Sequence, residues 1–208
     1  MRKNVILGAA VVGMLITACL VFCPSKAQSA VETGAKAPNF TLPNSNDEDT
    51  TLSDFAGSYV VLEWINHECP FVVKHYGSGN MQSLQEEFTD KGVIWLSINS
   101  SAPGKQGHCT GAEANDLTEQ KEASPTAVLL DPDGTVGKMY GAKTTPHMFI
   151  IDPDGKIIYQ GAIDDIPSFD PADIAQANNY VRLALGESMA GSAVSNPSTK
   201  SYGCSVKY

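Results

Sequence analysis

The chain has 208 residues, enough for one domain with a substantial core and few for two. Its net charge of −9 argues against nucleic acid as a partner, because phosphate recognition depends on a basic surface. Beyond the N-terminal segment the cysteines are Cys69, Cys109 and Cys204. An odd number leaves at least one thiol free in a monomer, which favours reactivity over a disulfide scaffold.

Residues 1–30 have the layout of an export signal, since Arg2 and Lys3 precede an uncharged apolar run that ends in small residues. Cleavage as a signal peptide, retention as a membrane anchor and lipidation at Cys19 are the alternatives. Each of them predicts an extracytoplasmic protein, periplasmic or membrane-associated, in a compartment where disulfides persist. Membrane anchorage through the N-terminus is therefore one expected partner interaction.

The first part of the folded domain, predicted over 31–186, begins with an extended leader at 31–40. Residues 59–65 are mostly apolar, β-branched or aromatic, which predicts a buried central strand. Cys69 follows that strand directly. It is therefore expected at the carboxyl end of a central strand, where open α/β sheets bind their ligands.

The middle of the chain predicts a helix, a strand and a long loop. Met81, Leu84 and Phe88 give one apolar helix face, and Gly92 ends that helix. Residues 93–98 form a second buried strand. The polar loop at 99–112 carries His108 and Cys109, and a short helix is expected at 113–122.

Two copies of Asp-Pro-Asp-Gly, at 131–134 and 152–155, predict turns. The first ends a strand at 127–130, and the second joins strands at 147–151 and 156–160 into a hairpin. We do not interpret either copy as a calcium loop, because the spaced acidic ligands of such a loop are missing.

A last helix is predicted from Asp170, as its N-cap, to Gly186, its stop. The segment at 187–208, which carries Cys204, is rich in small residues and predicts a flexible or surface-draped tail. The order of elements predicts an α/β protein of thioredoxin-like fold, with a central mixed sheet flanked by helices.

Three blocks of the sequence carry a family resemblance: GAKAPNFTLPN, LSDFAGSYVVLEWIN and LLDPDGTVGKMYGAKTTPHMFIIDPDGKIIYQGAIDD. They resemble the redoxin and thiol-disulfide oxidoreductase branch of the thioredoxin superfamily, which includes alkyl hydroperoxide reductase/thiol-specific antioxidant proteins. The resemblance implies an oxidoreductase that uses cysteine, without a cofactor or a metal, on thiol/disulfide proteins or hydroperoxides.

The resemblance also implies a site. Cys69 falls on the nucleophilic cysteine of the family's Cys-x-x-Cys motif, whereas Val72 falls on the second. Thr145-Pro146 matches the position of the family's cis-proline, which would bring the backbone of residue 145 against the sulfur. Partner-binding positions are expected at Thr145, His67, Pro70 and His147.

The sequence departs from the peroxiredoxin pattern near this site. Leu62 and Asn66 replace the proline and threonine of that pattern, and Arg182, the arginine of the exported part, lies on the last predicted helix. These departures weaken the case for peroxide activation by the arrangement typical of peroxiredoxins.

Since Val72 cannot resolve a mixed disulfide, the second sulfur must come from elsewhere. Cys204 on the tail is our first choice, because the tail is long enough to reach the site. Cys109 on the 99–112 loop and an exogenous thiol are the other two candidates. Either cysteine can also be a spectator, or the two can pair with each other.

A binding module of the same fold is the alternative function. Cys69 with nearby histidines, among them His67, His75, His108 and His147, could hold copper or zinc. The spacing of His67 and Cys69 is not that of a zinc finger, so this alternative ranks below redox chemistry.

Overall fold

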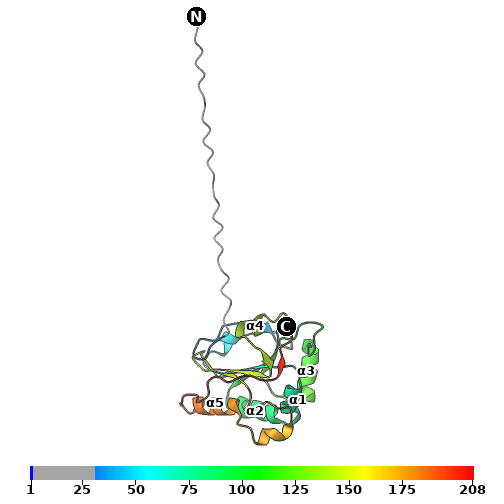
Figure 1. The fold of residues 1–208 in the computed structure, drawn as a ribbon, viewed down its shortest axis with the longest axis vertical. Coiled ribbons are helices and arrows are strands. Elements are labelled where there is room, and N and C mark those ends of the chain that lie inside the picture. The colour runs from blue at the N-terminus through cyan, green and yellow to red at the C-terminus, as the bar shows by residue number, and fades with distance from the viewer. Residues whose placement is uncertain (2–30) are drawn as a thin grey trace.

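A central sheet of five strands organises the computed structural model, which describes Met1 and residues 31–208 (Figure 1). The sheet order is β5-β4-β3-β7-β8, in which β3, β4 and β5 are parallel and β7 and β8 run antiparallel to their neighbours. The strands are β3 (Val60–Trp64), β4 (Ile94–Asn99), β5 (Ala127–Leu130), β7 (His147–Ile151) and β8 (Ile157–Gly161). The predicted mixed sheet and thioredoxin-like class are confirmed.

Helices cover both faces of this sheet. One face packs against α1 (Pro70–Gly77), α2 (Asn80–Thr89) and α5 (Tyr180–Met189). The other packs against α4 (Thr135–Tyr140), the hairpin β1 (Thr41–Pro43)–β2 (Asp49–Thr51) and the short helix η1 (Leu52–Phe55). Figure 1 shows the two layers, with α3 (Gly111–Gln120) at the β5 edge. All residues of β3 are buried because the strand is covered on both sides.

The predicted helix at 170–186 is wrong as a single element. The structure has a 3₁₀ helix, η2 (Pro171–Ala175), followed by the separate helix α5. Asp170 caps the amide of Ala172, and Asn179 starts the second helix by accepting from the amide of Arg182. Two capping side chains nine residues apart therefore divide one apolar pattern into two helices.

Two other helices differ from the sequence prediction. α4 was not predicted and follows the first Asp-Pro-Asp-Gly turn directly, because the Asp131 carboxylate accepts from the amides of Val136 and Gly137. α3 begins at Gly111, two residues earlier than predicted, since Thr110 and Glu113 form a capping box.

The tail is the largest difference from the prediction of a flexible segment at 187–208. It crosses the molecule and ends in β9 (Cys204–Ser205), which pairs antiparallel with β6 (Thr144–Thr145). Hydrogen bonds from the tail to Tyr159, Asp164 and Ala142 hold it against the domain. The structure matches the other alternative, a tail that lies along the surface, because the tail's polar groups hydrogen-bond to the domain.

The predicted export signal at 1–30 lies outside the described residues, apart from Met1. Within the part of the chain that is described, none of the helices has the length and apolar character needed to span a bilayer.

Candidate active site

Cys69 lies at the N-cap of α1, directly after the loop that leaves β3. Pro70 follows at the first helical position, where its missing amide costs the helix no hydrogen bond. The Cys69 side chain is completely buried, and its thiol donates to the carbonyl oxygen of Thr145 at 3.0 Å. The Thr145-Pro146 peptide bond is cis. The predicted apposition of Cys69 and residue 145 is therefore present in the fold.

The tail brings a second sulfur to Cys69. In the β6–β9 pair Cys204 lies opposite Thr145, the residue whose carbonyl Cys69 contacts. The Cys204 side chain packs against the apolar cluster that contains Cys69, between the sheet and α1, and the two thiols are close enough for each to shift the pKa of the other. Cys69 and Cys204, separated by most of the chain, are both free thiols in this arrangement.

The two sulfurs differ in acidity. Burial alone would raise the pKa of Cys69, but the Cys204 side chain and the backbone amide of Val72 outweigh it, so the pKa is lowered. The pKa of Cys204 is raised, because its sulfur is partly desolvated and donates to Cys69. Cys69 is therefore the better thiolate and Cys204 its protonated neighbour, an asymmetry that suits a nucleophile and a second thiol.

Cys109 lies at a different place. Its sulfur accepts from the Asn99 amide at 3.1 Å, and its side chain packs against Ala114 and Val128 beside α3. Burial raises the pKa of this thiol. The structure does not bring Cys109 into the group formed by Cys69, Thr145 and Cys204, and its surroundings are those of a packed apolar residue.

The histidines near the site are neutral, and most of them contact other side chains or the backbone. Burial lowers the pKa of His67 to about 4, and its ring stacks edge-on against Tyr76. His147 follows the cis-proline, accepts from the amide of Lys143 and has a pKa lowered to about 4 by burial. His75 contacts Asn80 and Tyr202.

These positions give the metal alternative no support. Among Met1 and residues 31–208, no three side chains of the His, Cys, Asp and Glu types lie close enough together to hold a metal ion. His108 hydrogen-bonds to the Ser101 carbonyl in its own loop, so it belongs to a different part of the molecule.

The side chain of Arg182 also forms its contacts away from Cys69. Its guanidinium pairs with Glu87 at 2.8 Å, which joins α5 to α2 on the protein surface. The arginine therefore does not stabilise the Cys69 thiolate, in agreement with the departure from the peroxiredoxin pattern noted in the sequence.

Two features of the site were missed in the sequence. Glu63, in the centre of β3, is fully buried and accepts hydrogen bonds from Tyr76, Trp95 and Ser97; burial raises its pKa. An acid inside the apolar run VVLEWI was the available signal. The second feature is the contact of Tyr202 with Asp164, for which residue types alone gave no signal.

Comparisons with known proteins identify the family of the chain. The family model described as AhpC/TSA matches residues 33–160. The chain is 24% identical over 164 residues to the thiol-disulfide oxidoreductase ResA of Bacillus cereus, covering 77% of this chain and 89% of that protein. It is 27% identical over 121 residues to a peroxiredoxin-type protein, bcp, of Coxiella burnetii, covering 58% and 73%.

A crystal structure of an uncharacterised conserved protein from Geobacillus kaustophilus superposes with a TM-score of 0.71 at 28% identity, covering 85% of this chain and 92% of that one. The family match spans more than half of the chain, and it includes β3, Cys69 and the cis-proline. The chain belongs to the AhpC/TSA family, within the thioredoxin-like redoxins.

Proposed function

We propose that this protein is an exported thiol oxidoreductase that exchanges disulfides, with Cys69 as the nucleophile and Cys204 as the resolving cysteine. The observation that carries the proposal is the contact of the two thiols, made possible because β9 pairs with the strand that precedes the cis-proline. The lowered pKa of Cys69 favours the thiolate, which is the form that attacks a disulfide.

The exchange proceeds in two balanced steps. The Cys69 thiolate attacks one sulfur of a partner disulfide, forms a mixed disulfide with it and expels the partner's other sulfur as a thiolate. Cys204 then loses its proton and attacks the Cys69 sulfur, which releases the partner's first sulfur. The products are a reduced partner dithiol and a Cys69–Cys204 disulfide, and the same steps in reverse oxidise a partner dithiol.

Disulfides rank ahead of hydroperoxides as substrates. Leu62, Asn66 and the surface pair of Arg182 with Glu87 leave Cys69 without the groups that the peroxiredoxin pattern supplies. The chain has relatives named for each of the two chemistries: ResA is named as a thiol-disulfide oxidoreductase, and bcp as a peroxiredoxin. The extracytoplasmic location rests on the export signal of the sequence, and an oxidising compartment suits this chemistry.

We propose Thr145 and Pro146 as the positions that bind the partner, with Pro70, His67 and His147 around them; because β9 pairs with Thr145 in this structure, the partner must displace β9 to reach Cys69. Pro70 is exposed beside the nucleophile, whereas His67 and His147 are neutral and largely buried. The histidines therefore shape the walls of the site rather than supply charge to it.

Trapping experiments test the roles of the cysteines. Cys69→Ser is expected to abolish reduction of a model protein disulfide. Cys204→Ala is expected to accumulate the mixed disulfide on Cys69, because resolution is lost while attack remains. Cys109→Ser serves as the matched control and should turn over like the wild type. Full activity of Cys69→Ser would contradict the proposal.

A further inference from the structure

A resolving cysteine on a tail needs something that holds it at the nucleophile. The described tail leaves α5 after Met189 and reaches Cys204 without any helix, and β9 is only two residues long. Two β-paired residues are too few to fix a strand by themselves. Side-chain contacts next to Cys204 must therefore contribute to its position.

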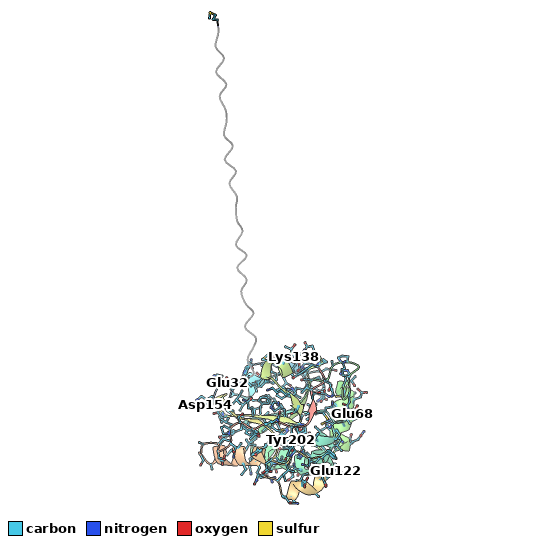
Figure 2. All side chains as sticks on the ribbon, viewed as in Figure 1. Glu32, Glu68, Glu122, Lys138, Asp154 and Tyr202 are labelled. Atoms are coloured by element: carbon cyan, nitrogen blue, oxygen red, sulfur yellow. The ribbon has the colours of Figure 1, made fainter. Side chains whose placement is uncertain are left out.

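Tyr202, two residues before Cys204, makes such a contact. Its hydroxyl donates to a carboxylate oxygen of Asp164, and its ring packs edge-on against Phe71 at 5.7 Å between centroids. Figure 2 labels Tyr202, which is half-buried, near the centre of the view, whereas Glu122 and Asp154 lie nearer its outline. A hydrogen bond to a charged acceptor is about twice as strong as a neutral one.

Asp164 connects this contact to the helix of the nucleophile. Its side chain is only 2% exposed, and it faces Lys74 Nζ at 3.7 Å and His75 Nε2 at 3.8 Å. Both of those residues lie on α1, the helix that Cys69 caps. Phe71, under the Tyr202 ring, lies on the same helix. The contacts of Tyr202 thus join the tail directly to the element that positions Cys69.

The connection from Tyr202 to Cys204 is short and conformationally defined. Gly203 between them has φ +130, and an added Cβ there would lie 2.1 Å from the Thr145 carbonyl oxygen. The chain is pressed against the strand before the cis-proline at this residue. A displacement of Tyr202 would therefore be transmitted to the Cys204 sulfur.

We propose that Tyr202 is a positioning residue: its hydrogen bond to Asp164 and its packing on Phe71 fix the tail to α1, and so hold Cys204 against Cys69. The inference deepens the proposed disulfide exchange and rests on it. The buried ion pair of Asp164 with Lys74 supplies a fixed acceptor, so the anchor costs little reorganisation when the tail docks.

The contacts of the residues after Cys204 differ from those of Tyr202 in their charge and in the side of the sheet that they reach. Tyr208 donates to the carbonyl of Ala142, and the amide of Val206 donates to the carbonyl of Lys143. These bonds are neutral and reach the side of the sheet that carries α4, away from the Cys69 helix. They secure the end of the chain, whereas the Tyr202 anchor sets the distance between the two sulfurs.

Tyr202→Phe in the full chain tests the anchor, because it removes the hydroxyl and keeps the ring on Phe71. The measurements are the effective concentration of the Cys69–Cys204 pair against glutathione and the rate at which iodoacetamide alkylates Cys69 in the reduced protein. We expect the effective concentration to fall about tenfold and the alkylation rate to rise about tenfold. A tenfold change corresponds to the free energy of about one hydrogen bond to a charged group.

Tyr59→Phe is the matched control, since it removes a hydroxyl that bonds at 3.0 Å to Ser188 on α5, in the helix that precedes the extended part of the tail. It should leave both measurements unchanged. If Tyr202→Phe behaves like Tyr59→Phe, the anchor is wrong while the proposed function stands. If the wild type itself forms no Cys69–Cys204 disulfide, the resolving role of Cys204 fails instead. Asp164→Asn, which keeps an acceptor oxygen, should retain more of the wild-type effective concentration than Tyr202→Phe does.

Discussion

Gly203→Ala is the substitution that most directly disturbs the approach of the two sulfurs. The new Cβ would lie 2.1 Å from the Thr145 carbonyl oxygen and 2.8 Å from its carbonyl carbon. Since carbon and its neighbours pack at about 3.5 Å, β9 must retreat from β6 by about 1 Å or more. The backbone at φ +130 adds strain of about 1–3 kcal/mol, because that region is almost restricted to glycine.

A displacement of this size is large for a reaction between two positioned groups, where 1 Å can cost about 100-fold in rate. We therefore expect Gly203→Ala to slow closure of the Cys69–Cys204 disulfide by about two orders of magnitude. The assay follows closure after a mixed disulfide with glutathione has been formed on Cys69, using acid quenching and mass spectrometry of the released glutathione.

Gly191→Ala provides the matched control, because Gly191 also has a positive φ, of 78°, and nothing lies within 4 Å of an added Cβ. Both variants carry a strained alanine, but only one of them pushes on Thr145. Equal closure rates in the two variants would refute the reasoning, since the close approach at residue 203 would then have no part in positioning Cys204.

Three further predictions concern the cysteines and the buried acid. Cys109→Ser should leave closure of the disulfide within about twofold of wild type, measured by the same quench, because its sulfur belongs to a separate apolar cluster; a large loss would restore Cys109 as a resolving thiol. Val72→Cys in a Cys204→Ala background should recover turnover, since residues 69 and 72 lie on one face of the first helical turn, and continued trapping of the mixed disulfide would contradict this. Glu63→Gln should remove a pH dependence of stability: the folded pKa of Glu63 is raised above its unfolded value of 4.5, so the folded state retains a proton that the unfolded state loses. The wild type should therefore lose stability relative to Glu63→Gln as pH rises above 4.5, by up to about 1.4 kcal/mol per pH unit, as urea unfolding midpoints would report; a constant difference across pH would count against it.

The sequence predicted the sheet well because its signals were local. A dense apolar run before Cys69 and the Asp-Pro-Asp-Gly turn before 156–160 each specify one element, and the structure has strands there. The last helix was harder, since its periodicity spans 170–186 but the caps at Asp170 and Asn179 divide it. Capping side chains override a weak apolar pattern when both compete for the same backbone.

Only part of the site could be predicted from the sequence, because only some of its residues belong to local motifs. Cys69 and Pro146 belong to motifs of a few residues, so the sequence pattern was sufficient to find them. The position of Cys204 depends on a strand pair and on the Tyr202–Asp164 contact, which join residues far apart in the chain. Composition predicted a tail that is either flexible or draped over the surface, because small residues are common in such segments, and no local signal indicated the hydrogen-bond acceptors on the domain that hold it.

The central claim is that Cys69 and Cys204 form one redox couple, and disulfide mapping tests it most directly. The purified protein would be oxidised with an excess of oxidised glutathione, alkylated, digested and analysed by mass spectrometry. We predict one dominant cross-linked peptide pair, containing Cys69 and Cys204, with Cys109 alkylated as a free thiol. A dominant Cys69–Cys109 link, or a Cys69 that carries only glutathione, would contradict the account.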